Sequence, residues 1–194
     1  MNAKRVALAA LLSAVTIVVG YARGVGIGLP GIVEFMTVLI FVAGFCFGWT
    51  IGGTVGFVTL TIYMLIPYPF AHPAAWLLTI SPVLLVVMGG LGAMYGIVGG
   101  LLGRVQGQAR LGARFIVEMA LVGFSLTFVY DIASSIGFYI AYFVYPSVWE
   151  AIYMTFIPAY MPYPPIIHTI TNTLVFASLA PALIQAMKTL RAYF

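Results

Sequence analysis

The sequence predicts an all-α integral membrane protein, a compact bundle of about six transmembrane helices in a single domain over residues 1–194. Hydrophobic residues make up 63% of the chain and charged residues only 6%, whereas about a quarter of the residues in a soluble domain are charged. A membrane-spanning helix needs about 20 apolar residues. About six such segments with short connections fill the 194 residues, so we expect no separate soluble domain.

The first three helices are predicted from apolar segments and the glycines between them. The first, at 4–21, has a basic start and an apolar core like a signal peptide, but no convincing cleavage site follows, so we expect it to remain as a helix. A glycine-rich segment through Pro30 separates it from the second helix at 31–47. A break near Gly48 then leads into the third helix at 50–66.

The second half of the chain alternates helices with proline-rich or basic segments, which interrupt regular structure. In order, these are a connection with three prolines (67–76), the fourth helix (77–102), a basic linker (104–114), the fifth helix (115–142), an aromatic and proline-rich segment (144–165) and the sixth helix (166–190). Within the aromatic segment we expect a short helix at 149–156, lying at the membrane interface.

Small residues line one face of the third and fourth helices. Gly48, Gly52 and Gly56 recur at every fourth position, and residues 89–100 read GGLGAMYGIVGG. Such faces allow a neighbouring helix backbone to approach closely. We therefore expect tight helix packing here.

The basic residues predict how the bundle is oriented. Six spans place both termini and the linker 104–114 on one side of the membrane. That side carries every lysine and arginine except Arg23, so the positive-inside bias predicts that both termini are cytoplasmic. The net charge of +4 is spread over helix ends rather than over a continuous face, so nucleic acid is not an expected partner.

Asp131 is a carboxylate within the apolar stretch 124–142. A charge in hydrocarbon is costly, so such residues usually face the bundle interior and mark a ligand or ion path. Hydroxyl groups surround it in the sequence, on Tyr130, Ser134, Ser135 and Tyr142. The helical spacing puts Asp131 and Ser135 on one face, predicted as one wall of a ligand site. Alternatively, Asp131 pairs with a polar group of another helix and only fixes their packing.

Further candidate ligand contacts lie on other segments. His168 and Asn172 are spaced i, i+4 on the sixth helix and share a face. Glu34 is either a ligand contact or the partner of Arg23 in an ion pair that closes the first outer connection. Trp76, with other aromatic residues of the outer segments, either stacks on a flat ligand or belongs to an interfacial aromatic belt.

Sequence motifs of catalysis are absent: the chain has no HExxH, GxSxG, P-loop or CxxC pattern. We therefore expect no enzymatic activity and no cofactor or metal. The single cysteine, Cys46, cannot form a disulfide within the chain. An intramembrane enzyme using Asp131 and His168 is the least favoured interpretation, because no nucleophile or metal-ligand set accompanies them.

The first helix carries a stripe of alanines. Ala7, Ala10 and Ala14 follow Ala3 at positions i+4, i+7 and i+11. A stripe of small side chains lets another helix dock closely. That helix belongs either to a partner protein or to the same bundle.

Together these features resemble the substrate-binding S component of an energy-coupling factor (ECF) vitamin transporter. The features are the length, the basic pair followed by the alanine stripe, the glycine-spaced third helix, the Tyr-Asp pair on the fifth helix and HTITNTLVFASLAPAL on the sixth. The resemblance covers essentially the whole chain. It implies a binding subunit for a small water-soluble vitamin or related heterocycle, and it leaves the identity of that solute open.

The resemblance also implies partners and contacts. Ala10 and Ala14, with Ala7 as an alternative register, would dock a transmembrane T subunit, which works with ATP-binding subunits. Asp131 and His168, together with Asn172, would contact the ligand. The alternative is a membrane scaffold similar to the cell-shape protein family MreD, which organises partners rather than carrying a solute.

Overall fold

The computed structural model describes residues 2–26, 34–65, 81–106, 112–143, 145–156 and 165–191. Every regular element within these residues is a helix. In chain order the helices are α1 (Ala3–Gly26), α2 (Phe35–Phe47), α3 (Trp49–Leu65), α5 (Pro82–Gln106), α6 (Ala113–Tyr142), α7 (Val148–Phe156) and α8 (Pro165–Arg191). The all-α fold predicted from the sequence is confirmed.

The helix bounds differ from the predicted ones by a few residues. Glu34 has an extended backbone (φ −114°, ψ 102°), so α2 begins at Phe35 rather than at 31. Helix α5 begins at Pro82 rather than at 77, and proline suits a first helical position because it lacks only an N–H that the helix does not use there. Helix α5 then continues to Gln106, which shortens the basic linker. Helix α7 confirms the predicted short helix.

Four described helices are long and apolar enough to cross a membrane: α1, α5, α6 and α8, with mean hydropathy between 1.4 and 1.9 over their apolar windows. Helices α2 and α3 are apolar but shorter, at 13 and 17 residues. At about 1.5 Å per residue, they reach about 20 and 25 Å, short of a hydrocarbon core of about 30 Å. The protein is therefore a membrane-embedded helical bundle in which, within the described residues, α2 and α3 are shorter than these four helices.

Glycines bring the backbones of α2, α3 and α5 into direct contact. A Cβ added to Gly44 on α2 or to Gly52 on α3 would meet the carbonyl oxygen of Gly96 on α5. A Cβ on Gly56 would likewise meet the backbone of Gly92. The tight packing predicted for these faces is confirmed. Between α2 and α3, Gly48 has φ +95°, which glycine adopts without the strain that a side chain would add.

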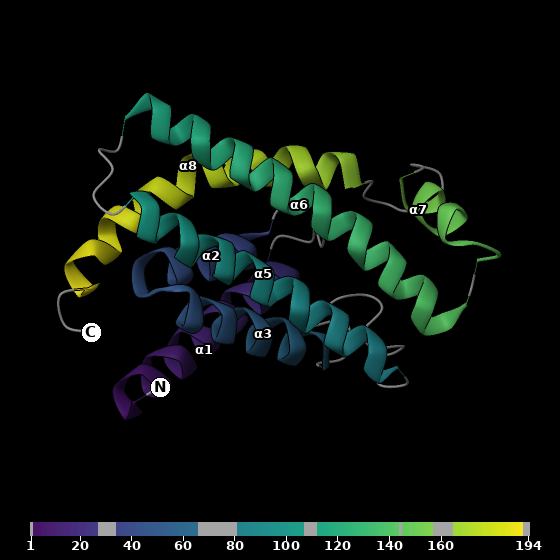
Figure 1. Ribbon diagram of the computed structural model, residues 1–194, viewed down its shortest axis with the longest axis horizontal. Helices are drawn as coiled ribbons and strands as arrows, with labels where there is room; N and C mark the ends of the chain where they lie inside the picture. Colours follow the sequence, from purple (N-terminus) through teal and green to yellow (C-terminus); the bar gives the residue numbers. More distant parts are fainter. Residues whose placement is uncertain are drawn as a thin grey trace.

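Helices α6 and α8 form the other part of the bundle, lying side by side across α2 and α5 (Figure 1). Their contact is close at Gly123, where a Cβ would meet the ring of Phe176. Phe176 on α8 also packs edge-on against Phe41 on α2, with ring centroids 5.3 Å apart. The fully buried Tyr95 on α5 completes this aromatic group, 6.1 Å from Phe176. Aromatic packing thus joins the two parts.

The two ends of the bundle differ in charge. Both chain termini lie at one end, which we call the terminal end (Figure 1). Arg5 near the start of α1 and Arg104 near the end of α5 line one pocket there, beside the α2–α3 break. Glu118 pairs with the exposed Arg114 at 2.8 Å, as its i−4 spacing predicts, and accepts a hydrogen bond from Gln106. Helix α7 lies at the opposite end, which we call the α7 end (Figure 1).

The glycine contacts predict that alanine substitutions at two glycines of α5 differ strongly in their effect on stability. Gly96→Ala should lower the free energy of unfolding by about 1–3 kcal/mol, because the added methyl overpacks a backbone contact with Gly52. Gly90→Ala, where the added Cβ meets nothing within 4 Å, is the matched control and should not destabilise the protein. Thermal unfolding in detergent measures both, and equal melting temperatures for the two variants would contradict the packing.

Candidate functional site

A buried polar cluster lies where α2, α5, α6 and α8 meet. Its members come from segments far apart in the sequence, and each is at most 9% exposed. We call it the Asp131 cluster; it consists of Glu34, Tyr95, Thr127, Asp131, His168, Thr169 and Asn172. In an otherwise apolar bundle, such a set of groups requires either mutual hydrogen bonds or a ligand.

The carboxylate of Asp131 on α6 is held by two side chains of α8. Its Oδ1 lies 2.8 Å from Nδ1 of His168, and its Oδ2 accepts a hydrogen bond of 3.1 Å from the hydroxyl of Thr169. Both carboxylate oxygens therefore have a partner. The predicted pairing of Asp131 with a polar group on another helix is present.

The second ring nitrogen of His168 faces both an amide and a carboxylate. Its Nε2 lies 3.2 Å from Nδ2 of Asn172 and 3.7 Å from Oε2 of Glu34. With the proton on Nδ1 alone, Nε2 accepts from Asn172; with both nitrogens protonated, Nε2 donates toward Glu34. The ring therefore has a partner in either state, and the two states differ in which neighbour they engage.

Asn172 connects three helices. Its Oδ1 accepts a 3.2 Å hydrogen bond from the backbone N–H of Glu34, one of the amides at a helix start that have no acceptor within the helix. Its Nδ2 lies 3.3 Å from the hydroxyl of Thr127 on α6, which also accepts from the phenol of Tyr95 on α5 at 3.2 Å. Asn172 is fully buried, so its amide fixes how α2 and α6 meet α8.

Helical spacing explains how the cluster assembles. His168 and Asn172 lie one turn apart on α8, and Thr127 and Asp131 lie one turn apart on α6, so each helix presents a polar pair on one face. Because α6 and α8 pack side by side, the two pairs meet. Glu34 reaches them because it directly precedes α2.

Most of the predicted ligand contacts lie together in or beside the Asp131 cluster, and the others either make different contacts or lie outside the described residues. Asp131, His168, Asn172 and Glu34 are joined as described above, and the ring of Tyr130 lies edge-on to His168 with centroids 6.2 Å apart. Ser135 is buried, but its hydroxyl donates to the backbone carbonyl of Asp131 at 2.7 Å rather than to the carboxylate. Trp76 lies outside the described residues, as does the side chain of Arg23.

Three members of the cluster, Thr127, Tyr95 and Thr169, were not among the predicted ligand contacts. Thr127 lies four residues before Asp131, so the same i, i+4 spacing that paired His168 with Asn172 was a usable signal. Tyr95 sits in a glycine-rich stretch that indicates packing. Nothing in its local sequence points to a contact with α6.

The Asp131 cluster offers hydrogen-bond donors and acceptors close to an excess of acidic groups. Two carboxylates, of Asp131 and Glu34, face the single imidazole of His168. With both carboxylates ionised and the ring protonated, these three groups sum to −1. Among the described residues, no group of three or more His, Cys, Asp or Glu side chains is arranged to hold a metal ion.

The predicted docking stripe lies on the outside of the bundle. Ala7, Ala10 and Ala14 are exposed along α1. The adjacent face of the same helix is turned inward, with Ala9 and Ser13 each 4% exposed. The stripe is thus accessible to another helix, whereas its neighbours pack within the bundle.

Comparison with protein-family models finds no match, and neither curated proteins nor solved structures match the chain. The site is therefore interpreted from its own geometry.

The burial of Asp131 predicts a stability difference between two carboxylates. Asp131→Ala should destabilise the protein by about 3–5 kcal/mol, because it leaves buried groups without a charged partner. Glu118→Ala, which removes a more exposed ion pair with Arg114, should cost about 0–1 kcal/mol. Chemical or thermal unfolding in detergent gives both values. Similar losses for the two variants would mean that the cluster contributes little to folding.

Proposed function

We propose that the protein is a membrane-embedded binding subunit for a small water-soluble solute, a vitamin or related heterocycle. In this proposal it resembles an ECF S component, works with an ATPase-driven energy-coupling module and catalyses no reaction itself. The observation that carries the proposal is the Asp131 cluster, which gathers Asp131, His168 and Asn172 with Glu34 in an otherwise apolar interior.

The position of the cluster within the bundle supports binding from one end. His168 lies in the first turns of α8, and Glu34 directly precedes α2, so the cluster lies nearer the α7 end than the terminal end. A solute entering from the α7 end reaches these groups without crossing the whole bundle. A few converging polar groups set in apolar walls are typical of small-molecule sites.

The hydrogen bonds of the cluster suggest how a solute is held. The amide of Asn172 and Nε2 of His168 bond each other in the structure, and a polar heterocycle can replace that bond with two of its own. Because Nε2 either accepts or donates, the ring suits a solute of either hydrogen-bonding character at that position. The rings of Tyr130 and Tyr95, 6.1 Å apart, supply aromatic surface beside it.

The remaining parts of the proposal concern orientation and partners. The terminal end carries Arg5, Arg104 and Arg114, so the positive-inside bias supports cytoplasmic termini. The prokaryotic cell membrane is proposed from the resemblance to an ECF S component. The exposed stripe Ala7, Ala10 and Ala14 is proposed to dock a transmembrane T subunit. Solute would then enter from outside and leave inward when the partner reorients the bundle.

A second candidate function is a membrane scaffold of the MreD-like class. It is favoured by the fact that the polar groups of the Asp131 cluster bond one another. Neither described pocket, one at the terminal end and one on α7, is lined by a cluster residue. A fully paired network serves helix packing equally well, so the ligand measurement below decides between the two.

Solute binding is expected to depend on the Asp131 cluster. A panel of vitamins, nucleobases and amino-acid derivatives should contain at least one compound that raises the melting temperature of the purified protein, because binding to the folded state alone stabilises it. Asp131→Asn and Asn172→Ala should each weaken the binding of that compound by tenfold or more, since losing a hydrogen bond to a charged or buried group costs about 1.5–3 kcal/mol.

The matched control is Thr173→Val, on the same helix. It removes a hydroxyl that bonds only the backbone carbonyl of Thr169 and should leave affinity unchanged. If no compound stabilises the protein, the scaffold function is favoured over solute binding. If Thr173→Val weakens binding as much as Asn172→Ala, the solute does not bind at the Asp131 cluster.

The alanine stripe predicts a selective loss of partner binding. Ala10→Leu with Ala14→Leu should abolish co-purification with a T subunit and ATP-dependent uptake, because large side chains overpack a backbone-level contact. Solute binding to the isolated protein should survive, since both positions are exposed. Ser178→Leu, an exposed position on α8, controls for added apolar bulk. Normal uptake by the double variant would place the docking surface elsewhere.

A further inference from the structure

A second candidate binding site lies at the terminal end of the bundle, at the end of α2 opposite to the Asp131 cluster. A pocket of about 350 Å³ opens there between α1, the α2–α3 break and α5. Its volume falls in the range of about 300–1,000 Å³ typical of small-molecule sites. The 13 residues of α2 separate it from Glu34 by about 20 Å, so the two sites do not overlap.

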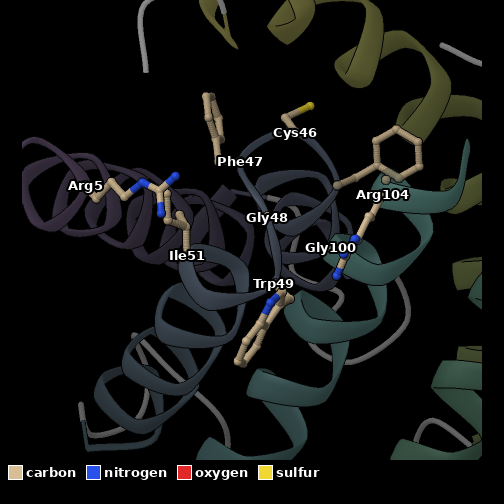
Figure 2. Close-up of a pocket in the computed structure, with 10 residues that line it drawn as sticks. Arg5, Cys46, Phe47, Gly48, Trp49, Ile51, Gly100 and Arg104 are labelled. Atoms are coloured by element: carbon tan, nitrogen blue, oxygen red, sulfur yellow. The ribbon is translucent and has the colours of Figure 1, made fainter. Parts of the chain in front are cut away.

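Two arginines from different helices enter this pocket. Figure 2 shows Arg5 reaching in from α1 and Arg104 from α5, on either side of the break at Gly48. Both residues are exposed at the surface of the bundle. The remaining lining is apolar or backbone, with Phe47, Trp49 and Ile51 on the walls and glycines of α5 between them.

The two positive charges have no counter-charge among the described residues. The chain has four acidic residues: Glu34 and Asp131 belong to the Asp131 cluster, Glu118 is engaged by Arg114 and Gln106, and Glu150 lies on α7. Within the described residues, neither guanidinium forms an ion pair. Both guanidinium groups are therefore available to an anion from outside the protein.

The pocket backbone adds a weaker preference of the same sign. Helix α3 starts at Trp49, which lines the pocket, and the preceding Gly48 has no side chain to accept from the first amides. The N–H groups of a first helical turn have no acceptor within their helix and favour negative charge. This contribution supports the two arginines and is secondary to them.

We infer that this pocket binds a phosphate group, with Arg5 and Arg104 as its ligands. Guanidinium groups match phosphate oxygens in a planar, two-pronged geometry, which makes arginine well suited to this contact. The phosphate comes either from an anionic phospholipid, whose headgroup lies at the level of the helix ends, or from a free phosphate in the aqueous phase. Basic pockets at the ends of membrane helices hold lipid headgroups in this way, and the apolar walls suit the lipid source.

The test measures affinity for three probes in a neutral detergent: dihexanoyl phosphatidic acid, dihexanoyl phosphatidylcholine and inorganic phosphate. Native mass spectrometry should show phosphatidic acid bound at least tenfold more tightly than phosphatidylcholine. Arg5→Gln and Arg104→Gln should each weaken that binding about tenfold, the effect of losing a charge-assisted hydrogen bond. Arg114→Gln is the matched control, because Arg114 is exposed but pairs with Glu118; it should change affinity less than about twofold.

The comparison of probes separates the two sources. Phosphatidic acid bound tenfold more tightly than inorganic phosphate assigns the site to lipid, whereas equal affinities assign it to a free phosphate group. Equal binding of phosphatidic acid and phosphatidylcholine overturns the inference. An equal loss in Arg114→Gln also overturns it, because the effect would then be general surface charge.

Trp49 provides an independent measure of location. The chain has three tryptophans, so a Trp76→Phe, Trp149→Phe protein reports on Trp49 alone. A brominated phosphatidic acid should quench its fluorescence with the same saturation as in the affinity measurement. A protein that binds this probe without saturable quenching places the phosphate outside the pocket and overturns the inference.

Discussion

The direct backbone contact of α5 with both α2 and α3 is the constraint on which the rest of the bundle depends. Gly44, Gly52 and Gly96 meet at a point where any side chain would collide with a neighbouring main chain. Without a strong hydrophobic drive between helices in lipid, such close approach supplies the dispersion and packing energy that holds a membrane bundle together. The same contact holds both α2 and α3 against α5.

The placement of α2 matters because each end of this helix adjoins one of the two candidate sites. Its start brings Glu34 against α8, where Asn172 accepts the backbone N–H of Glu34. Its end turns at Gly48, beside Arg104. If α2 slid along α5, each site would lose one wall. The glycine contacts therefore help to position two candidate sites about 20 Å apart, a distance given by the length of α2.

Much of the fold and part of the Asp131 cluster could be predicted from the sequence. Periodic apolar runs fix helices locally, and i, i+4 spacing put His168 and Asn172 on one face. The same rules could not predict that α6 and α8 lie side by side, which depends on contacts such as Gly123 with Phe176. Tyr95 was missed for this reason: its partner, Thr127, lies on a different helix, and no local pattern records that contact.

The charged groups in the two parts of the bundle differ in their surroundings. Nearer the α7 end, Asp131 and Glu34 are buried and contact the imidazole of His168 and neutral amide and hydroxyl groups, so their charges interact mainly with other groups of the protein. At the terminal end, Arg5 and Arg104 remain exposed around an apolar pocket with no acid between them. Burying a polar or charged group destabilises the fold unless the group is hydrogen-bonded or paired, whereas an exposed arginine at a helix end stays solvated and has little effect on stability. Under the proposed function, the Asp131 cluster would bind only a solute that replaces the hydrogen bonds it breaks, whereas the exposed arginines would bind a phosphate group without breaking any bond within the protein. The two proposals accordingly assign selectivity for the solute to the buried cluster and attraction to the membrane surface to the arginines.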